Sequence, residues 1–231
     1  MRVSAGLVDA VSGRDGKSFS EMYANVEAYY SARVAKHGAT PRGVDWSCQA
    51  TQELRFVQLL KICDLSTPFS LNDIGCGYGA LCAFLGRRHP QAAIDYLGID
   101  LSRAMIRRAR HRYSAPDRRF AVGKACPRIA TYSVASGIMN VNLGYPRECW
   151  EVFVAEMLFE MRRTSLRGFS VNFVTDEVKS SVSANSSQAQ LYCTNPERWV
   201  YYCERELGCM VKTIDDYGMT EVTLLAHCKD L

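Results

Sequence analysis

The sequence contains no long run of apolar residues. None of its apolar stretches approaches the roughly 18 residues that a membrane-spanning helix requires. The segment from Met1 to Gly6 also lacks the long apolar centre of a signal peptide. We therefore expect a protein that does not associate with membranes and that is located in the cytoplasm.

Patterns typical of metal sites and of disulfide scaffolds are missing as well. The 10 cysteines are scattered singly, without a C-x-x-C pair or a histidine at zinc-binding spacing. A disulfide framework is not expected in a chain of 231 residues without a secretion signal. We predict reduced cysteines that belong to the core, and no metal cofactor.

The chain also lacks a large excess of charge of one sign. Its net charge of +4 is modest for 231 residues, although arginines gather between residues 103 and 112. No aromatic residues are interleaved with them, as a platform for single-stranded nucleic acid would require. We interpret the arginines as a solvated helix face. A small molecule, and not a nucleic acid, is the expected partner, and the oligomeric state is left open.

What the sequence does have is a glycine-rich turn between an extended and a helical segment. The extended run 69–72 leads into Asp73-Ile74-Gly75-Cys76-Gly77-Tyr78-Gly79, and a helical run follows over 80–88. Because glycine has no Cβ atom, such a turn lets a ligand approach the backbone closely. Asp100 ends the next apolar run roughly twenty residues later, where an acid can bind the hydroxyl groups of a ribose. Together these features predict a nucleotide-type pocket.

The spacing of the glycines fits a dinucleotide poorly. The dinucleotide pattern is G-x-G-x-x-G and places a pyrophosphate at a helix N-terminus. Here an acid precedes G-x-G-x-G, and the Asp73 carboxylate favours a ligand with positive charge. The alternative is a tight turn with Asp100 as a helix cap. It accounts for each residue singly but not for their combination.

At these residues the chain resembles the class I S-adenosylmethionine-dependent methyltransferases, from about Gln52 to the C-terminus. The resemblance implies S-adenosylmethionine as the cofactor. The positions that it assigns are Asp73, Gly75, Cys76 and Gly77 for the methionine portion, Asp100 for the ribose, and Leu101, Ser102 and Met105 for the adenine. Ser136 and Asn140 match the end of the fourth strand, where the family makes cofactor and substrate contacts. Gly123-Lys124-Ala125 stands where the family often has an acid for the adenine amino group, so this contact is not assigned.

The order of the segments predicts an α/β fold with helices on both faces of a mostly parallel sheet. The expected strands are 69–74, 96–100, 119–122, 132–136 and 168–173, and the helices between and after them are 80–88, 102–113, 150–164 and 196–206. Two further runs, 210–214 and 221–226, are joined by a loop so short that only an antiparallel hairpin is possible. The resemblance implies a Rossmann-like sheet of seven strands, with the seventh between the fifth and the sixth.

We expect three segments along the chain. They are a mobile lead (1–17), a helical lid or cap (18–63) and a methyltransferase-fold core that binds the cofactor (64–231). In the first cap helix, Tyr23, Val26 and Tyr30 mark one face. The second cap helix is expected over 49–63, with Leu54, Val57 and Leu60 pointing inward. The serine-rich stretch 180–187 is expected to form a flexible rim.

The chemistry requires few dedicated groups. A methyl group on a sulfonium is already electrophilic, so the protein mainly aligns the acceptor and excludes water. We predict Asn140 and Tyr30 as catalytic residues, and His37, Trp46 and Asn172 as substrate contacts. Arg55 is expected to bind a carboxylate of the cofactor. The structural alternatives are a loop-capping Asn140, a His37 that interacts with the helix dipole, core aromatics and a surface Arg55.

Three functions are compatible with these features. The first is a methyltransferase that acts on a small molecule. The second is a cyclase that converts S-adenosylmethionine into azetidine-2-carboxylate and methylthioadenosine, because residues 38–46 and 137–141 look like a bacterial small-molecule subgroup that includes azetidine-2-carboxylate synthases. Glu177 stands where that subgroup is expected to have a tyrosine, which argues against it. The third is a binding protein without turnover, against which the intact glycines and acids argue.

Overall fold

The computed structural model describes residues 19–176 and 191–228 of the 231-residue chain. The expected lead (1–17), the serine-rich rim (180–187) and Glu177 lie outside the described residues.

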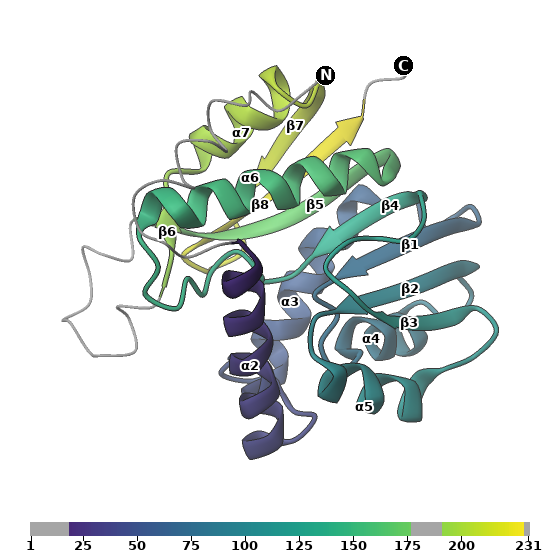
Figure 1. Cartoon of the computed structure of the whole chain (residues 1–231). Coiled ribbons are helices and arrows are strands. Elements are labelled where there is room, and N and C mark those ends of the chain that lie inside the picture. The colour runs from purple at the N-terminus through teal and green to yellow at the C-terminus, as the bar shows by residue number, and fades with distance from the viewer. Residues whose placement is uncertain (1–18, 177–190, 229–231) are drawn as a thin grey trace.

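The strands of the described residues form one mixed sheet, and the predicted fold class is confirmed (Figure 1). Its parallel strands are β1 (Phe69–Ile74), β2 (Ile94–Asp100), β3 (Arg118–Val122), β4 (Ala130–Ala135) and β5 (Ser165–Thr175). The antiparallel strands are β7 (Cys209–Ile214) and β8 (Glu221–Cys228). The order is β3-β2-β1-β4-β5-β8-β7, so the last strand lies between β5 and β7 as the resemblance implied. A short strand, β6 (Cys193–Thr194), pairs with the end of β5 and was not predicted.

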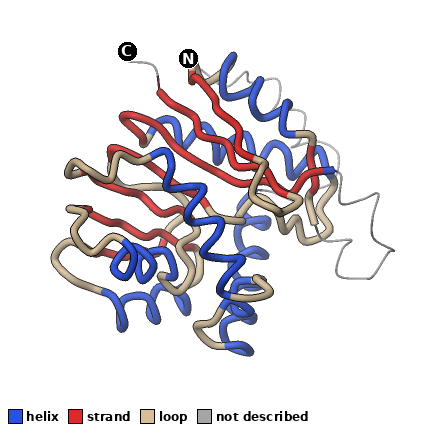
Figure 2. The backbone as a smooth tube through the Cα atoms, turned by 180° about the vertical axis from the view of Figure 1, so that it is seen from behind, coloured by secondary structure: helices blue, strands red, loops and turns tan. Residues whose placement is uncertain are grey.

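Helices cover both faces of the sheet (Figure 2). They are α2 (Phe19–His37), α3 (Gln49–Leu59), α4 (Ala80–Arg88), α5 (Arg103–Tyr113), α6 (Arg147–Arg163) and α7 (Pro196–Arg205), with short 3₁₀ helices η1 (Pro41–Val44) and η2 (Leu60–Ile62). Because successive side chains of a strand point to opposite faces, β8 contributes to two cores. Leu224 and Ala226 pack with α6 and α7, whereas Leu225 packs with α3 and α4.

The predicted buried face of the second cap helix is only partly right: Leu60 is buried as expected, but the rest of the face differs. Val57 is 41% exposed and Leu54 is half-buried, whereas Arg55 and Phe56 are buried. The hydrophobic pattern misled because α3 turns polar side chains inward, where partners distant in the sequence bind them. Arg55, for example, bonds to Glu221 on β8. The helix also ends at Leu59 and continues as η2, and does not run unbroken to residue 63.

The two helices of the predicted cap have different surroundings. Helix α2 stands across the ends of the central strands (Figure 1), where Tyr23, Val26 and Tyr30 line a pocket. Helix α3 instead packs against β5, β8 and α4. Gln52 and Phe56 of α3 line the same pocket, so a covering role stays a prediction for both helices.

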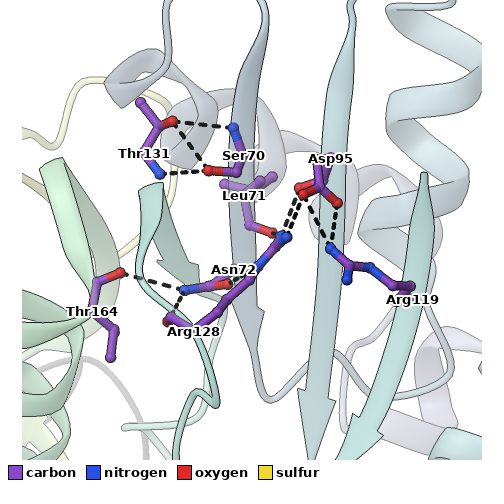
Figure 3. Close-up of polar contacts among 8 residues, drawn as sticks. All are labelled: Ser70, Leu71, Asn72, Asp95, Arg119, Arg128, Thr131 and Thr164. Carbon is purple, nitrogen blue, oxygen red and sulfur yellow. Dashed lines mark hydrogen bonds and ion pairs between the residues drawn. The ribbon is translucent and has the colours of Figure 1, made fainter. Parts of the chain in front are cut away.

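A polar cluster at the amino ends of the strands joins β1, β2 and the connection into β4 (Figure 3). Arg128, just before β4, donates to Asn72 Oδ1 at 3.1 Å and to the backbone oxygens of Leu71 and Asp95 at 3.1 and 2.7 Å. It also forms an ion pair with the Asp95 carboxylate. Asn72 is fully buried, and its amide donates to the Thr164 backbone oxygen at the end of α6. One guanidinium thus satisfies acceptors on two strands.

Replacing Arg128 by alanine should lower the free energy of unfolding by about 2–4 kcal/mol, because it leaves the Asn72 amide oxygen and two backbone oxygens without this donor. Arg119 is the matched control: it binds the same Asp95 carboxylate, but its side chain is 55% exposed against 18% for Arg128. Arg119→Ala should cost less than about 1 kcal/mol. Urea denaturation measures both, and equal losses would contradict this account.

Candidate functional site

A pocket lies at the carboxyl ends of the parallel strands, at the point where the strand order reverses between β1 and β4. Open α/β sheets bind ligands at such a switch point, because the two flanking loops diverge there. The walls come from α2, α3 and α6 and from the loops that follow β1, β2, β3 and β4. The principal apolar lining residues are Tyr23, Val26, Tyr30, Trp46, Ile138, Phe153 and Met157.

The glycine turn after β1 forms the floor of this pocket. Gly75, Gly77 and Gly79 all have positive φ angles, of 73°, 55° and 87°. At Gly75 a Cβ atom would lie 2.2 Å from the Ile138 side chain, so the position has no room for another residue. The backbone N–H of Gly75 bonds to the Ile99 oxygen at 2.8 Å, which ties the turn to β2. Packing against Ile138 thus accounts for Gly75, and the close approach of a ligand to this backbone stays a prediction.

Asp100, at the end of β2, organises the loops around the floor. Its Oδ2 accepts a hydrogen bond from the Gly77 backbone at 2.9 Å, and its Oδ1 accepts one from the Ser102 backbone at 2.8 Å. Ser102 in turn caps α5 by accepting from Met105 N at 3.2 Å. One carboxylate thus holds both the glycine turn and the start of α5, and retains lone pairs for a ligand.

Burial has changed the acidity of the two pocket acids. Desolvation raises the pKa of Asp73 to about 7, a shift that the bond from the Tyr96 hydroxyl opposes and the neighbouring Asp100 reinforces. Desolvation likewise raises the pKa of Asp100 to about 6, against the two backbone bonds. Both acids are costly to ionise in the empty pocket, and a bound cation would offset this cost.

The lining is acidic and suits a cation. It includes the carboxylates of Glu27, Asp73 and Asp100, against the single ammonium of Lys124. Among the described residues, no group of three or more His, Cys, Asp or Glu side chains could hold a metal ion. Within the same residues, no helix combines the length and apolarity that crossing a bilayer requires.

The structure brings most of the predicted site residues together. The ones that line the pocket are Tyr30, Trp46, Asp73, Gly75, Cys76, Gly77, Asp100, Leu101, Met105 and Ser136. Five others are not part of the lining: His37, Arg55, Ser102, Asn140 and Asn172. His37 lies in the last turn of α2, and Ser102 is buried as the cap of α5. Their predicted ligand contacts stay predictions.

Asn140 lies behind the pocket wall and is 2% exposed. Its Oδ1 accepts from the Val174 backbone at 3.2 Å, and its backbone oxygen accepts from Tyr192 N at 2.8 Å. Its Nδ2, like the hydroxyl of the lining residue Ser136, is buried without a hydrogen-bond partner among the described residues. Asn140 thus joins the loop after β4 to the end of β5, and its catalytic role stays a prediction.

Arg55 and Asn172 meet at a residue that sequence reasoning missed, Glu221. Arg55 Nε donates to Glu221 Oε2 at 2.8 Å, and Asn172 Nδ2 donates to the same oxygen at 2.9 Å. Asn172 Oδ1 accepts from the Gly137 backbone at 2.8 Å, and the Arg55 guanidinium lies 3.8 Å from the centre of the Trp46 ring. The only signal in the sequence was alternation along β5 and β8, which places Asn172 and Glu221 on the face toward α3.

Comparison with known proteins points to one family. Residues 72–158 match the family described as "Methyltransferase domain". "Putative methyltransferase Rv1506c" of Mycobacterium tuberculosis is 36% identical over 169 residues, which make up 73% of this chain and 98% of that protein. Human N-acetylserotonin methyltransferase in complex with SAM shares the fold, with a TM-score of 0.62 and 16% identity over 96% of this chain and 65% of that chain. The DhpI–SAH complex does so with a TM-score of 0.61 and 14% identity over 90% and 98%.

The raised pKa values predict a stability that falls as the pH rises. Between the unfolded pKa near 4 and the folded values of about 6 for Asp100 and 7 for Asp73, the folded protein binds more protons than the unfolded chain. The free energy of unfolding should therefore be highest near pH 4 and decline toward pH 7. Asp73→Asn, which resembles the protonated acid, should be more stable than the parent at pH 8, by on the order of 2 kcal/mol, and no more stable at pH 4.5.

Urea denaturation at a series of pH values measures both effects. Asp117→Asn is the control, because Asp117 is exposed at the start of β3. A parent protein that gains stability from pH 4.5 to pH 7, together with an Asp73→Asn variant that follows the same curve, would contradict the analysis.

Proposed function

Because this chain belongs to the class I S-adenosylmethionine-dependent methyltransferase family, we propose that it methylates a small molecule that binds beneath α2. The observation that carries the proposal is the division of the pocket lining. Its floor is made of the glycine turn and the acids Asp73 and Asp100, whereas the wall formed by α2 and α6 contributes Tyr23, Val26, Phe153 and Met157. The polar floor suits the cofactor, and the apolar wall suits a small acceptor.

In the proposed complex the chain's own residues hold and orient the reactants. The Asp100 carboxylate binds the ribose hydroxyls, and the Asp73 carboxylate faces the cationic methionine portion. S-adenosylmethionine supplies the electrophilic methyl group and leaves as S-adenosylhomocysteine. The apolar side chains of α2 and α6 exclude water from the acceptor, and this desolvation favours transfer of positive charge away from the sulfonium.

The proposed acceptor is nucleophilic without the help of a histidine or a phenolate base. All four histidines lie in the described part of the chain, and none of them lines the pocket. Burial raises the pKa of Tyr23 to about 12 and that of Tyr30 well above its usual value, so neither phenol is ionised near neutral pH. A neutral amine or a thiolate meets this condition, because each presents a lone pair directly.

One observation favours the cyclase as a second candidate. The segments 38–46 and 137–141, on which that resemblance rests, lie against each other: a Cβ atom at Gly137 would come within 2.2 Å of the Trp46 ring. In this reaction the amine of S-adenosylmethionine attacks its own γ-carbon, the carbon–sulfur bond breaks, methylthioadenosine leaves and the ring nitrogen loses a proton. Asn140, one of the two predicted catalytic residues, is not part of the lining, so methyl transfer remains the first proposal.

Incubation with S-adenosylmethionine alone, followed by mass spectrometry, separates the two reactions. Methyl transfer predicts that the compound persists until an acceptor is added from a panel of amines and thiols, and that S-adenosylhomocysteine then appears. The cyclase predicts methylthioadenosine and an azetidine amino acid without any addition. A protein-free blank is required to subtract the spontaneous breakdown of the substrate. A protein that binds S-adenosylmethionine but consumes it under neither condition contradicts both proposals.

Asp100→Ala should weaken the binding of S-adenosylmethionine and of S-adenosylhomocysteine by about 10- to 100-fold, because the ribose and the glycine turn lose a shared charged acceptor. Isothermal titration calorimetry measures the affinities, and Asp117→Ala serves as the surface control. An Asp100→Ala variant that binds like the parent would overturn the placement of the cofactor.

A further inference from the structure

A buried ion pair joins the last strand of the sheet to the helix that precedes the first strand. The side chains of Arg55 on α3 and Glu221 on β8 are only 6% and 5% exposed. Two parallel hydrogen bonds connect them, from Nε to Oε2 and from Nη2 to Oε1. The remaining guanidinium nitrogen, Nη1, donates to the Thr51 backbone oxygen at 2.8 Å. The guanidinium is therefore held in one orientation.

This orientation places the guanidinium against Trp46. The distance from Arg55 Cζ to the centre of the Trp46 ring is 3.8 Å, which is a close cation–π contact. Trp46 itself lines the pocket, next to the loop that follows β4. A flexible lysine could not reproduce both the planar stacking and the paired bonds to the carboxylate.

Gly137 also limits the position of the Trp46 ring. A Cβ atom there would lie 2.2 Å from Cζ2 of Trp46 and 2.7 Å from Cη2, so only glycine allows the ring this close. Asn172 fixes Gly137 by accepting its backbone N–H at 2.8 Å, and Asn172 donates to Glu221 at 2.9 Å. The contacts thus close a circuit from Trp46 through Arg55, Glu221, Asn172 and Gly137 back to Trp46.

Stability alone does not account for a charge pair at this place. Apolar residues of similar volume are often as stabilising as a buried ion pair, because the pair must first be removed from water. What an apolar pair cannot supply is a planar cation of defined orientation beneath an aromatic ring. The arrangement therefore has a geometric effect on the pocket that hydrophobic packing would not provide.

We propose that Glu221 is a positioning residue that, through Arg55 and Asn172, fixes Trp46 as a wall of the pocket. Of the five residues in this circuit, only Trp46 and Gly137 line the pocket. In this proposal Arg55 and Asn172 support the pocket wall and do not contact the ligand directly. The inference deepens the proposed function, since it concerns the wall that the acceptor would meet.

The test uses the full chain labelled with 5-fluorotryptophan. The protein has three tryptophans, Trp46, Trp150 and Trp199, and a Trp46→Phe variant assigns the resonance of Trp46. Glu221→Gln and Arg55→Lys should shift or broaden the Trp46 resonance and leave those of Trp150 and Trp199 sharp. Glu53→Gln is the matched control, because Glu53 lies on the same helix but pairs with the exposed Arg87. It should leave all three resonances in place.

A double variant, Arg55→Met with Glu221→Met, separates positioning from folding. It removes both charges and fills the space, but it leaves the Asn172 amide without its acceptor. The melting temperature should therefore stay closer to that of the parent than in Arg55→Met or Glu221→Met alone, each of which leaves an unpaired buried charge, while the Trp46 resonance still shifts or broadens. A Trp46 resonance that matches the parent in Glu221→Gln, Arg55→Lys and the double variant overturns the inference. Calorimetry with S-adenosylhomocysteine on the parent tests the cofactor site independently. Binding there with an unchanged Trp46 resonance defeats only the positioning role, and absent binding defeats only the proposed function.

Discussion

The ion pair between Arg55 and Glu221 connects elements that the chain itself keeps far apart. It joins α3, which precedes the sheet, to β8, the last strand, and Asn172 extends the connection to β5 and to the loop after β4. All three polar side chains are buried, so each is stable there only while the others satisfy it. The pocket wall at Trp46 and Gly137 rests on this network. Under the proposed positioning role, a change in any of its members alters the pocket wall and not only the core.

The floor of the pocket follows a different principle. Asp73 is buried and the neighbouring Asp100 is half-buried, and desolvation raises the pKa of Asp73 to about 7 and that of Asp100 to about 6. Both carboxyl groups are thus harder to ionise than in water. A cationic ligand offsets this cost, because its charge stabilises the ionised carboxylates. Ionising these two acids lowers the stability of the folded protein at neutral pH, and a bound cation recovers that free energy. Such an exchange of stability for binding is common at functional sites.

The polar floor and the apolar wall of the pocket suit different reactants of methyl transfer. Backbone groups of the glycine turn and the acids at the strand ends belong to elements that the sheet holds rigidly, so they can bind an invariant cofactor. Helix α2 contacts the pocket mainly through apolar side chains such as Tyr23 and Val26. Such a surface can be varied without disturbing the floor, which is how one fold serves many acceptors.

The sequence by itself determined the local features of this protein. The alternation of segments predicted the sheet and its closing hairpin. The acid-and-glycine pattern after β1, with Asp100 after β2, predicted residues that the structure gathers in one pocket, because these signals depend on neighbours within a few residues. Tertiary structure alone decided what depends on distant partners. The sequence left open whether Arg55 contacts the cofactor or lies at the surface; it is buried, because Glu221 on the distant strand β8 satisfies it. Glu221 could not be singled out, because its importance arises only when β8 inserts beside β5 and brings it next to Asn172 and Arg55.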